Sequence, residues 1–193
     1  IDSLTTQQIQ ALTTAQAASL TTSQIQALTD AQIQSLTTSQ VSNLVTSQVA
    51  ALLDAQVAVL ETADLVKLTT AAVAELNANA VGSLTPGQAA NLTTDQIKAL
   101  TTNFGSLSAG AVTALTTDQF AVITGSQINS LSAGNVADAA GNGPGDSVGG
   151  IQLTTTNDAA RPVHRVAKSA GNGGVITIPL IISSACHGGV CTP

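Results

Sequence analysis

The residues that could perform chemistry are few, and the best group stands near the end of the 193-residue chain. Cys186, His187 and Cys191 lie close together in the sequence, and cysteine and histidine are typical zinc ligands. A metal site needs at least one further ligand, and His164 is the only other histidine. We therefore interpret Cys186 and Cys191 as a disulfide, formed within one loop or between subunits in an oxidising compartment. The sequence predicts no metal site and no cofactor.

Composition argues against catalysis, nucleic-acid binding and membrane insertion. Only 8% of the residues are charged, compared with about 25% in ordinary soluble domains, and no nucleophile–base pair is recognisable. Five basic residues against eleven acidic ones give a net charge of −6, whereas a phosphate-binding face needs clustered Lys and Arg. No stretch approaches the roughly 18 apolar residues of a membrane span. We expect neither an enzyme, nor a nucleic-acid-binding protein, nor a membrane-spanning one.

An eight-residue repeat, here called the octad, organises most of the chain. Its consensus is L-T-T-x-Q-[I/V]-x-[A/S], and 17 units can be counted, of which 16 begin with Leu and one with Ile123. Internal repeats at a fixed period are typical of solenoids and arrays. The series is regular from Leu4 to Leu100, loses one residue, and resumes at Leu107, Leu115, Ile123 and Leu131.

The octad predicts a short helix followed by a corner. The first Thr stands at the N-cap position and Gln stands three residues later, which is the spacing of a capping box, while Leu and Ile/Val have the spacing of a hydrophobic staple. Such short helices must stack on one another to persist. We therefore expect a mostly α fold, a solenoid of short helices, with a Thr-rich β-solenoid as the alternative. Gln occupies the third helical position at 8, 16, 24, 32, 40, 48, 56, 88, 96, 119 and 127.

Some units depart from the consensus. Val45, Leu53 and Glu61 replace the capping Thr, and the units between Leu52 and Leu84 predict one or two longer helices. The unit that contains Phe104 and Gly105 is one residue short, which indicates a bend or a larger packing residue.

The periodicity divides the chain into three parts. Residues 1–139 form the predicted solenoid, residues 140–160 a Gly-rich linker, and residues 161–193 a connector of β-strands with a cysteine loop. Strand-like runs cover 151–156, 163–168 and 175–184, and the Gly-rich residues 171–174 predict a hairpin. Residues 1–139 carry a net charge of −7 (nine acidic, two basic) and residues 140–193 carry +1 (two acidic, three basic).

The third strand-like run is the candidate surface for self-assembly. Pro179 removes one backbone donor and favours an edge position for this strand. The strand could cover the last solenoid units, or it could add to the sheet of a neighbouring subunit. Its candidate contact residues lie on one face of the strand: Ile176, Ile178, Leu180 and Ile182.

The octads at residues 20–28 resemble the L-T-x-x-Q-[I/V]-x-A-L tracts of large bacterial secreted and cell-surface repeat proteins. The resemblance implies export and a structural or adhesive role. Together with the low charge, which weakens repulsion between copies, it leads us to expect an extracellular structural protein that self-assembles into a filament, tube or sheath. An adhesin or ligand-binding segment of a larger surface protein, in contact with a cell surface or matrix, is one alternative. An ice-binding solenoid with regular Thr arrays is another.

Overall fold

The computed structural model describes residues 3–131, 151–156, 163–170 and 174–181 of the chain. The chain divides into two compact units, Ile1–Ala139 and Ala140–Pro193, and each is described here by itself. Residues 182–193 lie outside the described part, so the predicted disulfide of Cys186 and Cys191 and the contact residue Ile182 stay predictions.

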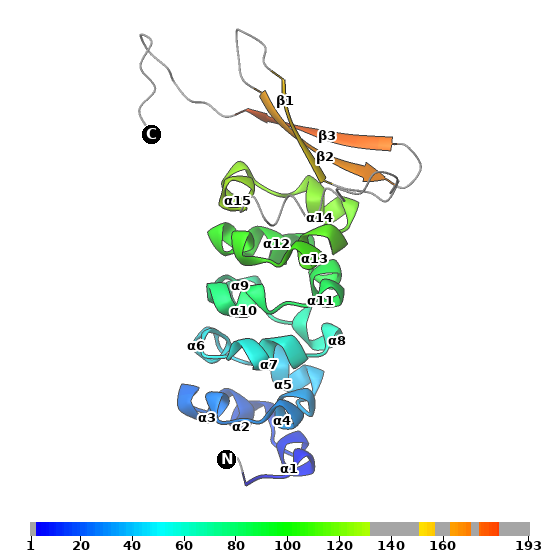
Figure 1. Cartoon of the computed structure of the whole chain (residues 1–193). Helices are drawn as coiled ribbons and strands as arrows, with labels where there is room; N and C mark the ends of the chain where they lie inside the picture. The colour runs from blue at the N-terminus through cyan, green and yellow to red at the C-terminus, as the bar shows by residue number, and fades with distance from the viewer. Residues whose placement is uncertain (1–2, 132–150, 157–162, 171–173, 182–193) are drawn as a thin grey trace, which may run out of the picture. The chain divides into compact units, whose positions relative to one another are not determined.

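The first unit is a solenoid of short helices, as the octad predicts, and the Thr-rich β-solenoid is excluded (Figure 1). Each helix spans four to six residues. Their bounds are α1 Thr6–Gln10, α2 Thr14–Ala18, α3 Thr22–Gln26, α4 Asp30–Gln34, α5 Thr38–Ser42, α6 Thr46–Ala50, α7 Asp54–Val59, α8 Thr62–Leu65, α9 Thr70–Ala74, α10 Ala78–Gly82, α11 Pro86–Asn91, α12 Thr94–Ala99, the 3-10 helix η1 Thr101–Ser106, α13 Ala109–Ala114, α14 Thr117–Ala121 and α15 Gly125–Ser130.

Capping boxes begin the helices at the predicted positions. In α1 the Thr5 N–H donates to Gln8 Oε1 at 2.8 Å, and the Gln8 N–H donates to Thr5 Oγ1 at 3.2 Å. Thr5 has an extended backbone (φ −73°, ψ 160°), which turns the chain at the corner before the helix begins. The same reciprocal pair recurs wherever a capping Thr and a Gln share one octad, for example in α12 with Thr93 and Gln96.

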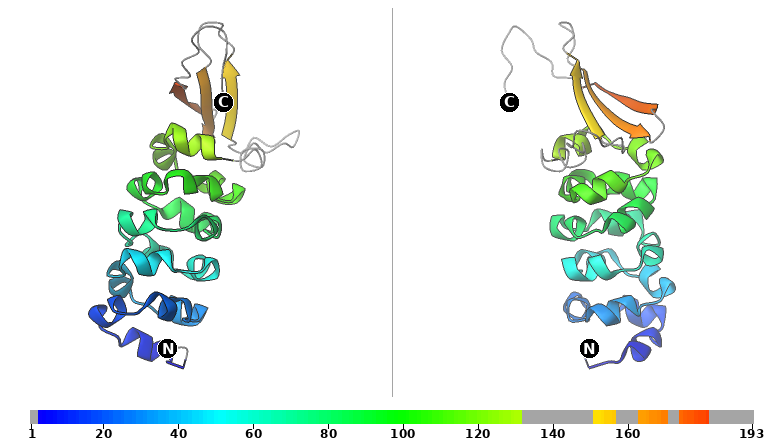
Figure 2. Two further views of the ribbon diagram at one scale, coloured as in Figure 1. Left: turned by 90° about the vertical axis from the view of Figure 1, so that its left-hand side faces the viewer. Right: turned by 45° about the vertical axis from the view of Figure 1, so that its right-hand side comes forward.

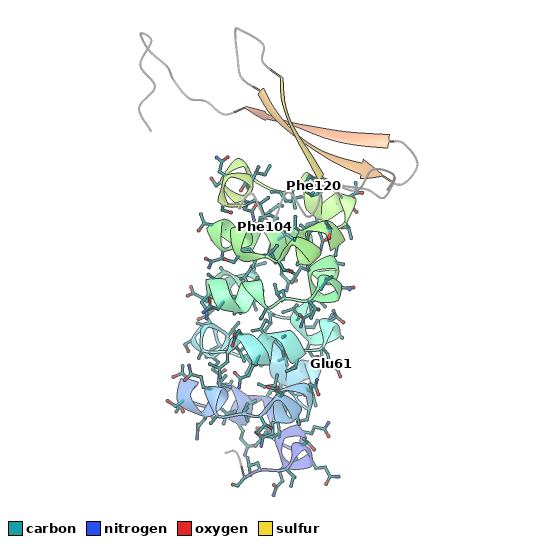
Figure 3. The ribbon with its side chains drawn as sticks, viewed as in Figure 1. Glu61, Phe104 and Phe120 are labelled. Atoms are coloured by element: carbon teal, nitrogen blue, oxygen red, sulfur yellow. The ribbon has the colours of Figure 1, made fainter. Side chains whose placement is uncertain are left out.

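The helices stack in coils along one axis, which the two further views in Figure 2 show from other sides. Each helix packs against the third helix after it, from α1 with α4 to α9 with α12. When η1 is counted as one helix, the same spacing continues through η1 with α15. The inner column consists of the octad Leu and Ile/Val positions, and both phenylalanines, Phe104 and Phe120, are buried in it. Figure 3 shows Phe104 inside the column and Glu61 at its outer side.

The units between Leu52 and Leu84 do not form longer helices, and that prediction is wrong. Their helices α7 to α10 span four to six residues, like the rest. Each still begins after an extended residue, even where Leu53 or Glu61 at the N-cap offers no side-chain hydrogen bond. The corner is therefore imposed by burial of the octad Leu residues, whereas a good cap only stabilises it.

Three strands of the second unit form an antiparallel sheet with the order β1-β2-β3. They are β1 Ile151–Thr156, β2 Val163–Ala170 and β3 Gly174–Ile181. β1 lies inside the 140–160 stretch, where the sequence predicts both a linker and this strand-like run. Ala170 pairs with Gly174, so β2 and β3 form the hairpin predicted around the glycines. β3 is an edge strand, as Pro179 favours.

Candidate interaction surface

The octad glutamines join successive coils of the solenoid. Gln40 Nε2 donates to the Ile9 carbonyl at 2.9 Å and to the Leu12 carbonyl at 2.7 Å, 31 and 28 residues earlier. Meanwhile its Oε1 accepts from the Thr37 N–H at 2.7 Å. One side chain therefore caps its own helix and binds the main chain of the coil before it. We call this set the glutamine ladder: Gln32, Gln40, Gln48, Gln56, Gln88, Gln96, Gln119 and Gln127.

The octad pattern predicts the capping bond of these glutamines but not their second bond, to the coil before. The repeat carries a partial signal, because Glu serves the N3 position of a capping box as well as Gln, yet Gln fills this position in 11 of the 17 octads and Glu in none. A carboxylate accepts hydrogen bonds but cannot donate one to a carbonyl. The preference for Gln thus favours a donor at this position, which the coil-to-coil contact explains, although Asp64, Ala72 and Ala80 take the same position in their octads and Asp64 is buried. All ladder glutamines are buried.

The ladder continues across the short unit of the repeat. After the missing residue, Gln119 Nε2 donates to the Ala89 and Leu92 carbonyls, now 30 and 27 residues earlier. Within the short unit Asn103 Nδ2 takes the place of the Gln amide and donates to the Leu76 carbonyl at 2.9 Å. Each coil that includes this unit is one residue shorter, and the stacking register is preserved. Thr101 takes a left-handed backbone conformation (φ 47°) where the chain is shortened.

The first coil presents the same side chains without a coil beneath them among the described residues. Gln8, Gln16 and Gln24 keep their capping boxes, but they are exposed, whereas the ladder glutamines are buried. No carbonyl of the described residues accepts from their Nε2 atoms. Three octad leucines of this coil are half-buried, namely Leu4, Leu12 and Leu20, while those from Leu28 to Leu115 are buried.

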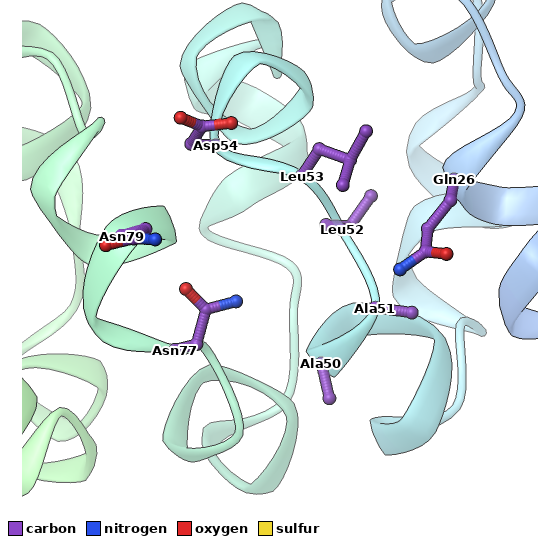
Figure 4. Close-up of a pocket in the computed structure, with 8 residues that line it drawn as sticks. All are labelled: Gln26, Ala50, Ala51, Leu52, Leu53, Asp54, Asn77 and Asn79. Carbon is purple, nitrogen blue, oxygen red and sulfur yellow. The ribbon is translucent and has the colours of Figure 1, made fainter.

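Two large apolar side chains are exposed on the side of the solenoid. Val45 and Leu53, at two consecutive N-cap positions, are 45% and 44% exposed. Leu53 borders a hollow of about 170 Å³ between coils, which is also lined by Gln26, Asp54 and Asn77 (Figure 4). This volume is below the roughly 300 Å³ at which ligand pockets begin. The hollow can hold only a small group.

The predicted contact residues of the tail occupy alternate positions on β3. Ile176 is paired with Lys168, Ile178 with Val166, and Leu180 with His164. Because β3 is an edge strand, one of its sides has no strand partner within the described sheet.

The described residues contain few other groups that could bind a ligand or an ion. They contain no group of three or more His, Cys, Asp or Glu residues that could bind a metal ion. Lys98 and Asp95 form an exposed ion pair at 3.3 Å on α12. Among the helices that the structure describes, none is both long and apolar enough to cross a bilayer.

Comparison with known proteins gives one match, to a family of sequence repeats. The model of the ALTTAQ repeat matches residues 57–94. This part spans α8 to α11, where the octads depart most from the consensus. No curated protein and no solved structure matches the chain. The chain is therefore a repeat protein, built as a solenoid of short helices.

Proposed function

We propose that this repeat protein is an extracellular structural protein whose copies assemble into a filament, tube or sheath. The observation that carries the proposal is the contact between coils, in which Gln48 Nε2 of one coil donates to the Ala17 and Leu20 carbonyls of the coil before it. Contacts of this kind between neighbouring repeats can recur along one axis and build an extended array.

The remaining chemistry of the solenoid also supports a building role. Thr and Gln side chains are engaged in caps and coil contacts, and Leu and Ile/Val fill the column. β3 offers a second contact, because a strand edge can add a strand from a neighbouring copy. Ile176, Ile178 and Leu180 are the contact residues that we assign to this lateral association.

Electron microscopy of the purified full-length chain, combined with sedimentation velocity over a concentration series, tests the proposal. We expect elongated particles whose length grows with protein concentration. A monodisperse monomer at high concentration would contradict self-assembly. Mass spectrometry of the unreduced protein tests the secreted state, since we expect Cys186 and Cys191 to be oxidised.

A binding segment of a larger surface protein is the second candidate, and the exposed Val45 and Leu53 favour it. Two apolar side chains at consecutive corners, one beside a hollow, could contact a cell-surface or matrix molecule. Binding to immobilised matrix proteins and glycans, compared between the natural chain and Leu53→Thr, tests this candidate. Equal binding by the two proteins would remove its support.

A further inference from the structure

The coil-to-coil hydrogen bonds of the solenoid fall into two separate sets. The first set joins side chains of α4 to α7 to carbonyls of residues 4–28. The second set joins side chains of the elements from α11 to α15 to carbonyls of residues 57–97. Among the described residues, no coil-to-coil hydrogen bond joins one set to the other. The ladder is therefore interrupted between Gln56 and Val57, inside α7.

Three consecutive octads without a donor cause the interruption. The ladder position holds Asp64 in α8, Ala72 in α9 and Ala80 in α10. Neither an alanine methyl group nor a carboxylate can donate a hydrogen bond. In the ladder each glutamine binds an octad Leu carbonyl 28 residues earlier. At the same offset from these three positions lie carbonyls that accept no side-chain hydrogen bond among the described residues: Leu36, Leu44 and Leu52.

Packing still joins the coils at this point, and we call the contact the seam. Helices α8, α9 and α10 pack against α5, α6 and α7, and Ala72 and Ala80 are 0% exposed. Apolar packing has no preferred direction, whereas a hydrogen bond weakens steeply when its angle changes. The seam separates a first block, residues 4–56, from a second block, residues 57–131.

The hollow in Figure 4 lies on the seam. Gln26 and residues 50–54 line it from the first block, and Asn77 and Asn79 line it from the second. Both asparagines belong to the start of α10, the helix in which Ala80 replaces the ladder glutamine. Groups around a void lose packing contacts on that side. The seam therefore lacks part of its packing as well as its hydrogen bonds.

We propose that the seam divides the solenoid into two cooperative blocks, so that the coils separate there more readily than at contacts with ladder bonds. The stability of a solenoid is approximately a sum over its repeats and the contacts between neighbours, and local opening follows the weakest contacts. Coils joined by the ladder lose hydrogen bonds when they separate, whereas the seam opens without breaking any side-chain hydrogen bond. A chain under tension lengthens at the seam while both blocks stay folded. The inference does not depend on self-assembly.

Two matched substitutions in the full-length chain test the division, Ile33→Val in α4 and Ile97→Val in α12. Both residues are buried, and each change removes one methyl group. Native-state hydrogen exchange, followed by mass spectrometry, reports on the amides of both blocks. We expect Ile33→Val to speed exchange about fivefold in the first block only, and Ile97→Val to do so in the second block only. Equal acceleration in both blocks by either variant would overturn the proposal.

Restoring the donors tests the cause of the division. The double variant Ala72→Gln and Ala80→Gln supplies two amides at the seam, so that Ile33→Val in this background should speed exchange in both blocks. The control Ala71→Gln and Ala78→Gln adds the same groups at exposed positions of the same helices, and it should leave the blocks separate. Blocks that stay separate in the seam variant would overturn the missing hydrogen bonds as the cause. If the added glutamines unfold the chain, the valine variants, which add no volume, still decide whether the blocks are separate.

Discussion

The coil-to-coil bonds of the glutamine ladder can be measured by comparing two alanine substitutions, Gln24→Ala and Gln40→Ala. Both residues cap their helices with the same geometry, since the N–H groups of Thr21 and Thr37 donate to their Oε1 atoms at 2.9 and 2.7 Å. Only Gln40 also donates to carbonyls of an earlier coil within the described residues. It is 1% exposed, whereas Gln24 is exposed. The difference between the two variants therefore isolates the contact between coils.

The magnitude follows from the bonds that each variant loses. Both variants lose half of a capping box, which costs about 0.5–1 kcal/mol. Gln40→Ala also loses the two short bonds to the carbonyls of Ile9 and Leu12, at about 0.5–1.5 kcal/mol each, and a longer one to the Gln10 carbonyl at 3.4 Å. We expect Gln40→Ala to lower the free energy of unfolding by about 2 kcal/mol more than Gln24→Ala. Urea denaturation followed by far-ultraviolet circular dichroism measures this difference. Equal losses in the two variants would refute the assignment of the ladder as a stabilising contact.

The substitution Gln40→Glu adds a pH-dependent version of the same test. Its carboxyl would be buried against carbonyl oxygens, so its pKa should rise above the ordinary value of about 4.3. A raised carboxyl pKa destabilises the folded state at neutral pH, and this penalty disappears as the pH falls through the folded pKa toward the unfolded one. We expect the stability deficit of Gln40→Glu to shrink in acid, while Gln24→Glu shows no such change. A deficit that is independent of pH would mean that the introduced carboxyl reaches solvent.

Further predictions concern the short unit and the imperfect caps. A Cβ at Gly105 would lie 2.1 Å from the Ser130 carbonyl oxygen, whereas one at Gly87 meets nothing within 4 Å. Gly105→Ala should therefore lower the thermal midpoint by the equivalent of about 1–3 kcal/mol, and Gly87→Ala should raise it by about 0.4–1 kcal/mol; the reverse order would contradict the close packing of η1 on α15. Val45→Thr supplies the missing cap oxygen for the Gln48 N–H and should stabilise the chain by about 1 kcal/mol. No gain in a urea titration would show that the existing bond from the Gln48 N–H to the Val45 carbonyl at 2.9 Å already suffices.

Local structure could be predicted from the octad because every signal acts within a few residues. Thr at the N-cap, Gln at N3 and a Leu every eight residues specify where each helix begins and where the chain turns. The short unit predicts a bend or a larger packing residue, and its Phe104 is fully buried. The prediction of longer helices after Leu52 was wrong because it weighed the missing caps at Leu53 and Glu61 above the leucine spacing, which persists there.

The sequence by itself therefore determined a solenoid of short capped helices, the hairpin of β2 and β3, and the edge position of β3. Only the tertiary structure decided how many residues make one full turn of the coil. Donor and acceptor lie 28 and 31 residues apart because the bends at successive corners together close one turn over that length of chain. It also showed that Gln40 and its equivalents act twice, once within the helix and once between coils. The first bond joins residues three apart, and the local pattern predicts it. The second joins residues that become neighbours only when the coil closes, so no local pattern specifies its acceptor.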